Sequence, residues 1–125
     1  MEVDELVRYI RSIPDFPVKG VLFRDITPLL KDRDAFKTAV SGLADNFRDH
    51  NVDLVSAVEA RGFIIGAPLA IELSAGFVPI RKPGKLPYDS IREEYSLEYG
   101  TNVLEMHRDA IKPGEKVLIA DDLIA

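Results

Sequence analysis

A chain of 125 residues can bury a hydrophobic core, and we expect it to form one domain at most. Hydrophobic residues make up 46% of it and charged residues 30%, which excludes intrinsic disorder, and the lack of cysteine excludes disulfides and thiolate metal sites. The net charge of −5 argues against nucleic-acid binding but permits a local anion site.

The first part of the chain contains two helical patterns separated by a turn-rich segment. A short first helix is predicted by apolar residues at helical spacing, namely Val3, Leu6, Val7 and Ile10. We expect Pro14 to end this helix, and Pro17 and Gly20 to mark a loop that leads into residues 21–26. Asp32 or Asp34 can cap a second helix. Its apolar face consists of Phe36, Val40, Leu43, Ala44 and Phe47.

The remainder of the chain alternates apolar strands with turns and one helical segment. Strands are predicted at residues 54–58, 77–80 and 117–120. Residues 63–73 form an apolar segment between the first two strands, and Pro68 argues against an uninterrupted helix there. This alternation predicts an α/β fold, with a mainly parallel, twisted sheet covered by helices on both faces.

Two segments depart from this alternation. Residues 81–102 are rich in Lys, Pro, Gly, Tyr and Glu, and we expect them to form a flexible lid loop. The chain also stops five residues after its last strand, where an α/β domain continues into a crossover helix. We therefore expect a single domain, residues 1–125, that is truncated at its C-terminal end.

The sequence shows neither of two patterns that would indicate secretion or membrane insertion. The start, Met1 to Glu5, is acidic and does not show the pattern of a signal peptide. The longest nearly apolar run, residues 63–71, is about half of the ~20 residues that a membrane helix needs. We expect a cytoplasmic protein with no membrane contact.

Two adjacent carboxylates, Asp121 and Asp122, directly follow the last predicted strand. Ligands of parallel sheets bind at the carboxyl ends of strands, and paired carboxylates there need a positive or hydroxylated partner. A ribose with two vicinal hydroxyls, held with Mg²⁺, suits them. The alternative is an Asp that starts a turn and caps the next helix.

Basic residues follow the two earlier strands. Arg61 lies where a strand turns into a helix, so it and the helix N-terminus could hold a phosphate group, or it could pair on the surface with Glu59. Arg81, Lys82 and Lys85 form a cluster after the next strand, which in its simplest interpretation is a solvated loop.

Four segments together resemble the adenine phosphoribosyltransferases, a group of type I phosphoribosyltransferases. The last of them, V-L-I-A-D-D-L-I-A from Val117, is similar to the phosphoribosyl pyrophosphate signature of that family. The other three are P-D-F-P-V-K-G-V-L-F-R-D-I from Pro14, E-A-R-G-F from Glu59, and R-K-P-G-K-L-P from Arg81 with Y-S-L-E-Y-G from Tyr95. The resemblance implies the type I phosphoribosyltransferase fold and the conversion of adenine and phosphoribosyl pyrophosphate into AMP and pyrophosphate.

The resemblance also implies a role for each motif. Residues 1–30 would bind the base, with Phe23 stacking on adenine and backbone groups of Leu22 and Arg24 reading its edge. Without the resemblance, Leu22 and Phe23 would be interpreted as ordinary core residues. Glu98 would be the general acid/base and Tyr99 would lie near the reacting groups. The remaining implied substrate contacts are Glu59, Ala60, Arg61, Lys82, Lys85, Asp121, Asp122 and Ala125.

Further expectations follow from the family. Mg²⁺ would arrive with phosphoribosyl pyrophosphate, with no direct protein ligand, and the protein would form a homodimer. The segment that follows the signature in the family holds the 5′-phosphate, so we expect residues 1–125 alone to have little transferase activity. Three alternatives stay open: a non-catalytic nucleotide-sensing domain of the same fold, a transferase for xanthine or another purine, and a purely structural or engineered half.

Overall fold

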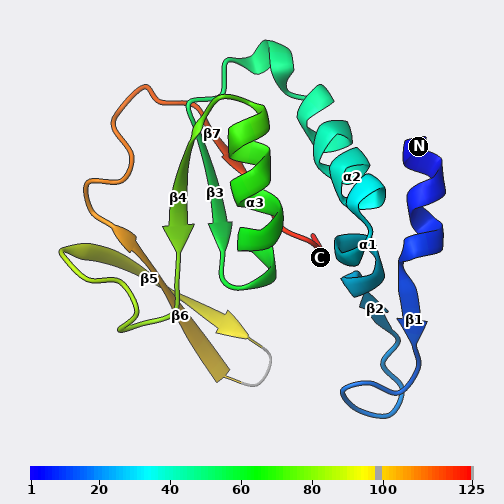
Figure 1. Ribbon diagram of the computed structural model, residues 1–125. Coiled ribbons are helices and arrows are strands. Elements are labelled where there is room, and N and C mark those ends of the chain that lie inside the picture. The colour runs from blue at the N-terminus through cyan, green and yellow to red at the C-terminus, as the bar shows by residue number, and fades with distance from the viewer. Residues whose placement is uncertain (98–99, 125) are drawn as a thin grey trace. The chain divides into compact units, whose positions relative to one another are not determined.

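The computed structural model describes residues 1–97 and 100–124, and it divides into two compact units, Met1–Asn46 and Phe47–Ala125 (Figure 1). The first unit contains a 3₁₀ helix, two short strands and two α-helices. In chain order these elements are η1 (Val3–Tyr9), β1 (Arg11–Ile13), β2 (Phe23–Asp25), α1 (Thr27–Lys31) and α2 (Arg33–Asp45).

The predicted first helix is present, but it is a 3₁₀ helix and it ends at Tyr9. The expectation that Pro14 ends it is wrong, because the chain leaves the helix earlier to form β1. This strand pairs antiparallel with β2, and Ile13 lies opposite Phe23. Backbone pairing with the next strand along the chain, rather than Pro14, thus determines where the helix ends.

Helix α2 confirms its predicted N-cap and part of its predicted apolar face. Asp32 is the N-cap, and its carboxylate accepts hydrogen bonds from the backbone N–H groups of Asp34 and Ala35. Of the predicted apolar face, Val40 and Ala44 are buried, whereas Leu43 is 39% exposed and Phe47 lies beyond the end of the helix. Ala35, which the prediction did not include, is buried as well. Of the two candidate caps, the structure therefore selects Asp32.

The second unit is built on a parallel sheet, as predicted, and the strand order is β4-β3-β7. Figure 1 shows helix α3 lying along β3 and β4. In chain order, the elements of the second unit are η2 (Arg48–His50), β3 (Leu54–Val58), α3 (Arg61–Glu72), β4 (Gly76–Ile80), β5 (Ser90–Leu97), β6 (Gly100–His107) and β7 (Val117–Ile119). The core between α3 and the sheet contains Val55, Ala57, Ile65, Leu69 and Ala70. Val78 is also buried, but it pairs with Ser56 and therefore points to the opposite face of the sheet.

Helix α3 corrects the expectation drawn from Pro68, because the helix continues through this residue. A proline inside a helix removes one backbone hydrogen bond and crowds the preceding turn. Ile65, Leu69 and Ala70 of the same helix are at most 5% exposed. Burial of these side chains against the sheet offsets that cost.

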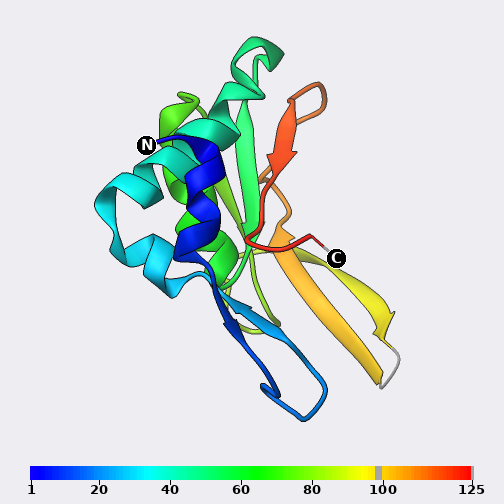
Figure 2. The ribbon, with the colours of Figure 1, turned by 90° about the vertical axis from the view of Figure 1, so that its right-hand side faces the viewer.

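The expected loop at residues 81–102 is also corrected in part, because residues 90–97 and 100–107 form an antiparallel hairpin, the long ribbon in Figure 2. The described side chains of β5 are exposed apart from Ser90, so no alternation of apolar and polar residues marks the strand in the sequence. Cross-strand pairs such as Arg92 and Glu105, joined by an ion pair of 3.4 Å, stabilise the ribbon instead.

Candidate functional site

The candidate site of the second unit lies at the carboxyl edge of its parallel sheet. Because β3, β4 and β7 run in the same direction, the segments that leave them emerge at this edge. The segment after β3 carries Glu59 and Arg61, the segment after β4 carries Lys82 and Lys85, and β7 leads into the two aspartates. The parallel topology therefore gathers residues from three distant parts of the sequence.

The turn between β3 and α3 contains a cis peptide bond between Glu59 and Ala60. Arg61 is the first residue of α3, so it lies at the N-terminal end of a helix that packs one face on the sheet. Gly62 lets this helix approach the end of β7, because a Cβ atom added there would be 3.2 Å from an Asp121 carboxylate oxygen. The turn and the acidic end of β7 are therefore in contact.

Arg61 and Asp122 form an ion pair across this contact, with 3.0 Å between Nε and Oδ2. The Asp122 side chain is only 8% exposed, whereas that of Arg61 is 52% exposed. Burial raises the pKa of Asp122 above its ordinary value, a hydrogen bond with Asp121 raises it further, and the charge of Arg61 opposes the increase. The acidic end of β7 thus has the positive partner that two adjacent carboxylates require.

Glu59 is the centre of the basic side of the site. Its Oε1 atom accepts hydrogen bonds from Arg81 Nε at 3.1 Å and from the Lys82 backbone N–H at 2.9 Å. Lys85 Nζ donates to Oε2 at 2.8 Å. The hydrogen bond from Lys85, followed by those from Lys82 and Arg81, lowers the pKa of Glu59 to about 2, so the carboxylate is charged at neutral pH.

Residues of β6 hold the loop that carries the two lysines. Arg81 and Glu105 exchange two backbone hydrogen bonds, of 2.9 and 2.8 Å, and the Glu105 carboxylate accepts one from the Gly84 N–H at 2.8 Å. Farther along, His107 Nε2 is hydrogen-bonded to the Pro87 carbonyl. Sequence analysis assigned no role to Glu105 or His107, and no local signal marks them, because their contacts depend on the hairpin.

The segment assigned to base binding lies in the first unit and is described by itself. Leu22 is 51% exposed, which argues against its alternative interpretation as a core residue. The ring of Phe23 packs edge-on against Phe16 with 5.2 Å between centroids, and Arg24 donates a hydrogen bond to the Ser12 hydroxyl.

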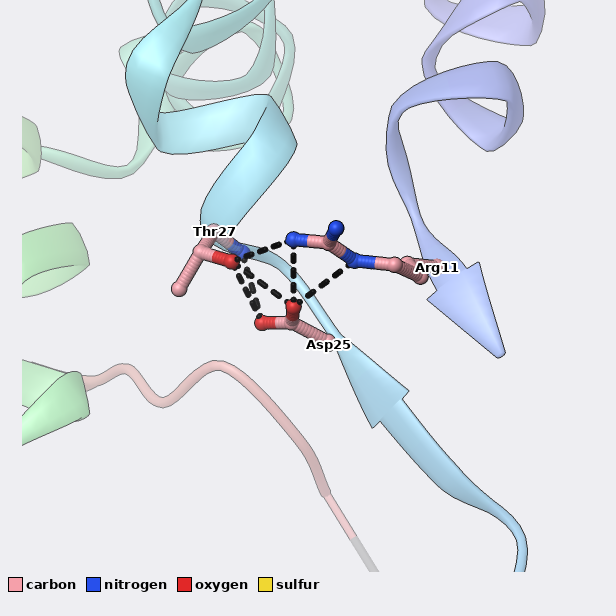
Figure 3. A network of polar contacts seen from close by, with 3 residues as sticks. All are labelled: Arg11, Asp25 and Thr27. Atoms are coloured by element: carbon pink, nitrogen blue, oxygen red, sulfur yellow. Dashed lines mark hydrogen bonds and ion pairs between the residues drawn. The ribbon is translucent and has the colours of Figure 1, made fainter. Parts of the chain in front are cut away.

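A polar network adjoins this segment at the start of α1 (Figure 3). Arg11 forms an ion pair of 3.0 Å with Asp25, which also accepts hydrogen bonds from the backbone N–H and the hydroxyl of Thr27. The hydrogen bonds from Thr27 and Arg11 keep the pKa of Asp25 below its ordinary value. The network fastens the end of β2 to the neighbouring strand and helix.

Three of the predicted site residues, Glu98, Tyr99 and Ala125, lie outside the described residues. Within residues 1–97 and 100–124, no cluster of three or more histidine, aspartate or glutamate side chains has a geometry suited to a metal ion. None of the helices in this part of the chain combines the length and hydropathy of a membrane span.

No protein-family model matches the chain. An adenine phosphoribosyltransferase of Halothermothrix orenii is 59% identical over 121 residues, which are 97% of this chain and 71% of the relative. The crystal structure of adenine phosphoribosyltransferase from Thermoanaerobacter pseudethanolicus matches with a TM-score of 0.94 and 54% identity, over 98% of this chain and 72% of that one. The Saccharomyces cerevisiae enzyme, complexed with adenine and a 1,6-bisphosphate, matches with a TM-score of 0.91 and 36% identity, over 98% and 72% of the two chains.

Proposed function

The chain belongs to the adenine phosphoribosyltransferase family, and on this premise we propose how its residues share the work of the transfer. The enzyme is a pentosyltransferase of purine salvage that converts adenine and phosphoribosyl pyrophosphate into AMP and pyrophosphate. In that reaction the bond from ribose C1′ to a pyrophosphate oxygen breaks, and its electron pair leaves with pyrophosphate. Adenine N9 bonds to C1′, and the N9 proton passes to a base.

We assign the pyrophosphate end of the substrate to Arg61, Lys82 and Lys85. Negative charge grows on pyrophosphate as the bond breaks, so positive groups fixed in advance stabilise the transition state more than the ground state. The supporting observation is that basic and acidic groups meet at one edge of the sheet, joined by the 3.0 Å contact between Arg61 and Asp122. The N-terminal end of α3, which follows the cis peptide of Glu59–Ala60, adds backbone N–H groups.

The ribose is assigned to Asp121 and Asp122, whose carboxylates accept hydrogen bonds from the 2′- and 3′-hydroxyls. They also bring negative charge towards C1′, where positive charge develops. Magnesium arrives with the substrate, because a hard cation that keeps several waters is bound through substrate phosphates and at most one or two carboxylates. Its chemistry is to neutralise charge on the leaving pyrophosphate.

Adenine is assigned to Leu22, Phe23 and Arg24. An adjacent backbone C=O and N–H, from Leu22 and Arg24, match the exocyclic amine and N1 of adenine, and Phe23 stacks on the ring at about 1–3 kcal/mol. The exposure of Leu22 and the network that fastens the end of β2 support a segment that presents its backbone to a ligand. Hypoxanthine and guanine reverse the donor and acceptor at this edge and leave buried polar groups unpaired.

The general acid/base is assigned to Glu98, with Tyr99 beside the reacting groups and Ala125 at the ribose phosphate. These assignments rest on the motifs alone, as does the proposal that the protein works as a cytoplasmic homodimer. The expectation that residues 1–125 alone have little activity also stays a prediction. Light scattering of the purified protein tests the dimer.

The function is tested by pyrophosphate release from phosphoribosyl pyrophosphate in the presence of adenine, hypoxanthine, guanine or xanthine. The assay uses the longest natural form of the protein that carries residues 1–125, and binding of AMP is measured by calorimetry in parallel. We expect adenine to be preferred by about 100-fold or more. Equal use of another purine contradicts the base assignment, and AMP binding without turnover identifies a nucleotide sensor instead.

A further inference from the structure

Glu59 stands among the residues assigned to substrate, but its surroundings do not suit a substrate ligand. Its side chain is only 9% exposed, and three N–H donors already occupy its two oxygens. A carboxylate in direct contact with pyrophosphate would also repel it. A group that is both enclosed and negatively charged acts on an anionic substrate only through its neighbours.

We propose that Glu59 is a positioning residue that holds the Lys85 ammonium in place for the pyrophosphate group, an inference that rests on the proposed function. The two carboxylate oxygens of Glu59 bind different partners. Oε1 binds the Lys82 N–H and Arg81 Nε, which fixes the backbone where the loop leaves β4. Oε2 binds Lys85 Nζ at 2.8 Å, across 26 residues of sequence.

The contact leaves Lys85 able to bind an anion at the same time. An ammonium has three N–H donors, so two remain when one points to Glu59. The Lys85 side chain is 48% exposed, which leaves its outer side open to a ligand. Fixing this flexible side chain before the substrate arrives reduces the rotamer entropy that binding would otherwise cost.

The local charge still favours an anion. Glu59 contributes one negative charge against the positive charges of Arg81 and Lys85, so the cluster keeps an excess of positive charge. The same cluster keeps the pKa of Glu59 near 2, so the carboxylate holds Lys85 throughout the neutral range. Glu59 is therefore charged, and able to pair with Lys85, in the conditions of the reaction.

The substitution Glu59→Gln tests the contacts of the two oxygens separately. The glutamine carbonyl can keep the Lys82 N–H and Arg81, but its NH₂ group then faces the Lys85 ammonium, and two donors cannot bind each other. Glu72→Gln is the matched control, because Glu72 also pairs with a basic residue, Arg48, at 2.9 Å, at the far end of α3. Melting temperatures of all variants show whether each folds.

The experiment is a double-mutant cycle of Glu59→Gln and Lys85→Gln, using the longest natural form of the protein. Its readouts are the dissociation constant of inorganic pyrophosphate by calorimetry and the KM for phosphoribosyl pyrophosphate. We expect each single variant to raise the dissociation constant and the KM on the order of tenfold, with a smaller change in kcat. The size is taken from residues that orient a ligand's direct partner. The double variant should be no weaker than Lys85→Gln, and Glu72→Gln should match the wild type.

Two outcomes overturn the inference while leaving the proposed function intact. One is unchanged or tighter pyrophosphate binding by Glu59→Gln when Lys85→Gln is weakened. The other is additive losses in the double variant, which would mean that Glu59 acts independently of Lys85. A wild type that neither binds pyrophosphate nor makes AMP rejects the proposed function itself.

Discussion

Replacing Arg61 with glutamine tests whether the acidic end of β7 depends on its ion pair. An exposed ion pair contributes at most about 1 kcal/mol, whereas removing one partner of a buried pair costs about 3–5 kcal/mol. Here the Asp122 side chain is 8% exposed and that of Arg61 is 52% exposed, so the pair lies between these limits. We expect Arg61→Gln to lower the free energy of unfolding by about 1–2 kcal/mol at neutral pH.

The loss should depend on pH in a defined direction. Burial already raises the pKa of Asp122 above its ordinary 3.8, and Arg61 opposes that increase, so removing Arg61 raises the pKa further. A carboxyl with a raised pKa in the folded state costs stability when it is charged and none when it is protonated. The loss is therefore complete above the raised pKa and decreases as the pH falls through it.

The assay is urea unfolding of wild type and Arg61→Gln at pH ~7.5 and again near pH ~4, close to the ordinary pKa of an aspartate. Asp122→Asn provides the control, because Arg61→Gln should cost less than about 0.5 kcal/mol in that background. An equal loss at both pH values, or an equal loss with and without Asp122, would refute the reasoning.

Three further predictions concern stability. Gly66→Ala should lower the free energy of unfolding in urea by about 1–3 kcal/mol despite the better helix propensity of alanine, because the added Cβ would lie 2.9 Å from both Ala57 and Phe77. Asp32→Ala removes the acceptor for two N–H groups of α2 and should cost about 1 kcal/mol, measured by thermal unfolding; no change would contradict the cap. The hydrogen bond from Lys85 is the main cause that lowers the pKa of Glu59 from 4.5 to about 2. The charged Glu59 carboxylate therefore stabilises the fold above pH 4.5, and this stabilisation is lost as the pH falls towards 2. In an acid titration followed by circular dichroism, Glu59→Gln should flatten this part of the curve, and an unchanged curve would count against the assignment.

Much of the fold follows from local sequence patterns. Helix α2 was predicted because burial of one face imposes a helical period on the sequence. The strands at 54–58 and 77–80 were predicted because a strand buried in a parallel sheet is a short, continuous apolar run. The hairpin of residues 90–107 was not predicted, because its described side chains on β5 are nearly all exposed and leave no such period. Helix α3 continues through Pro68 because packing on the sheet, which no local rule includes, offsets the lost hydrogen bond.

The candidate site was likewise predicted from the sequence only in part. The sequence by itself determined the family, through four motifs spread along the chain, and the positions of the charged residues within those motifs. It also predicted a parallel sheet, because strands and helices alternate along the chain. Only the tertiary structure decided the partners of those charges: Glu59 takes Lys85 and Arg81, and Arg61 takes Asp122. The physical reason is that an ion pair depends on which strand ends lie side by side, and strands of a parallel sheet bring together residues that are far apart in sequence.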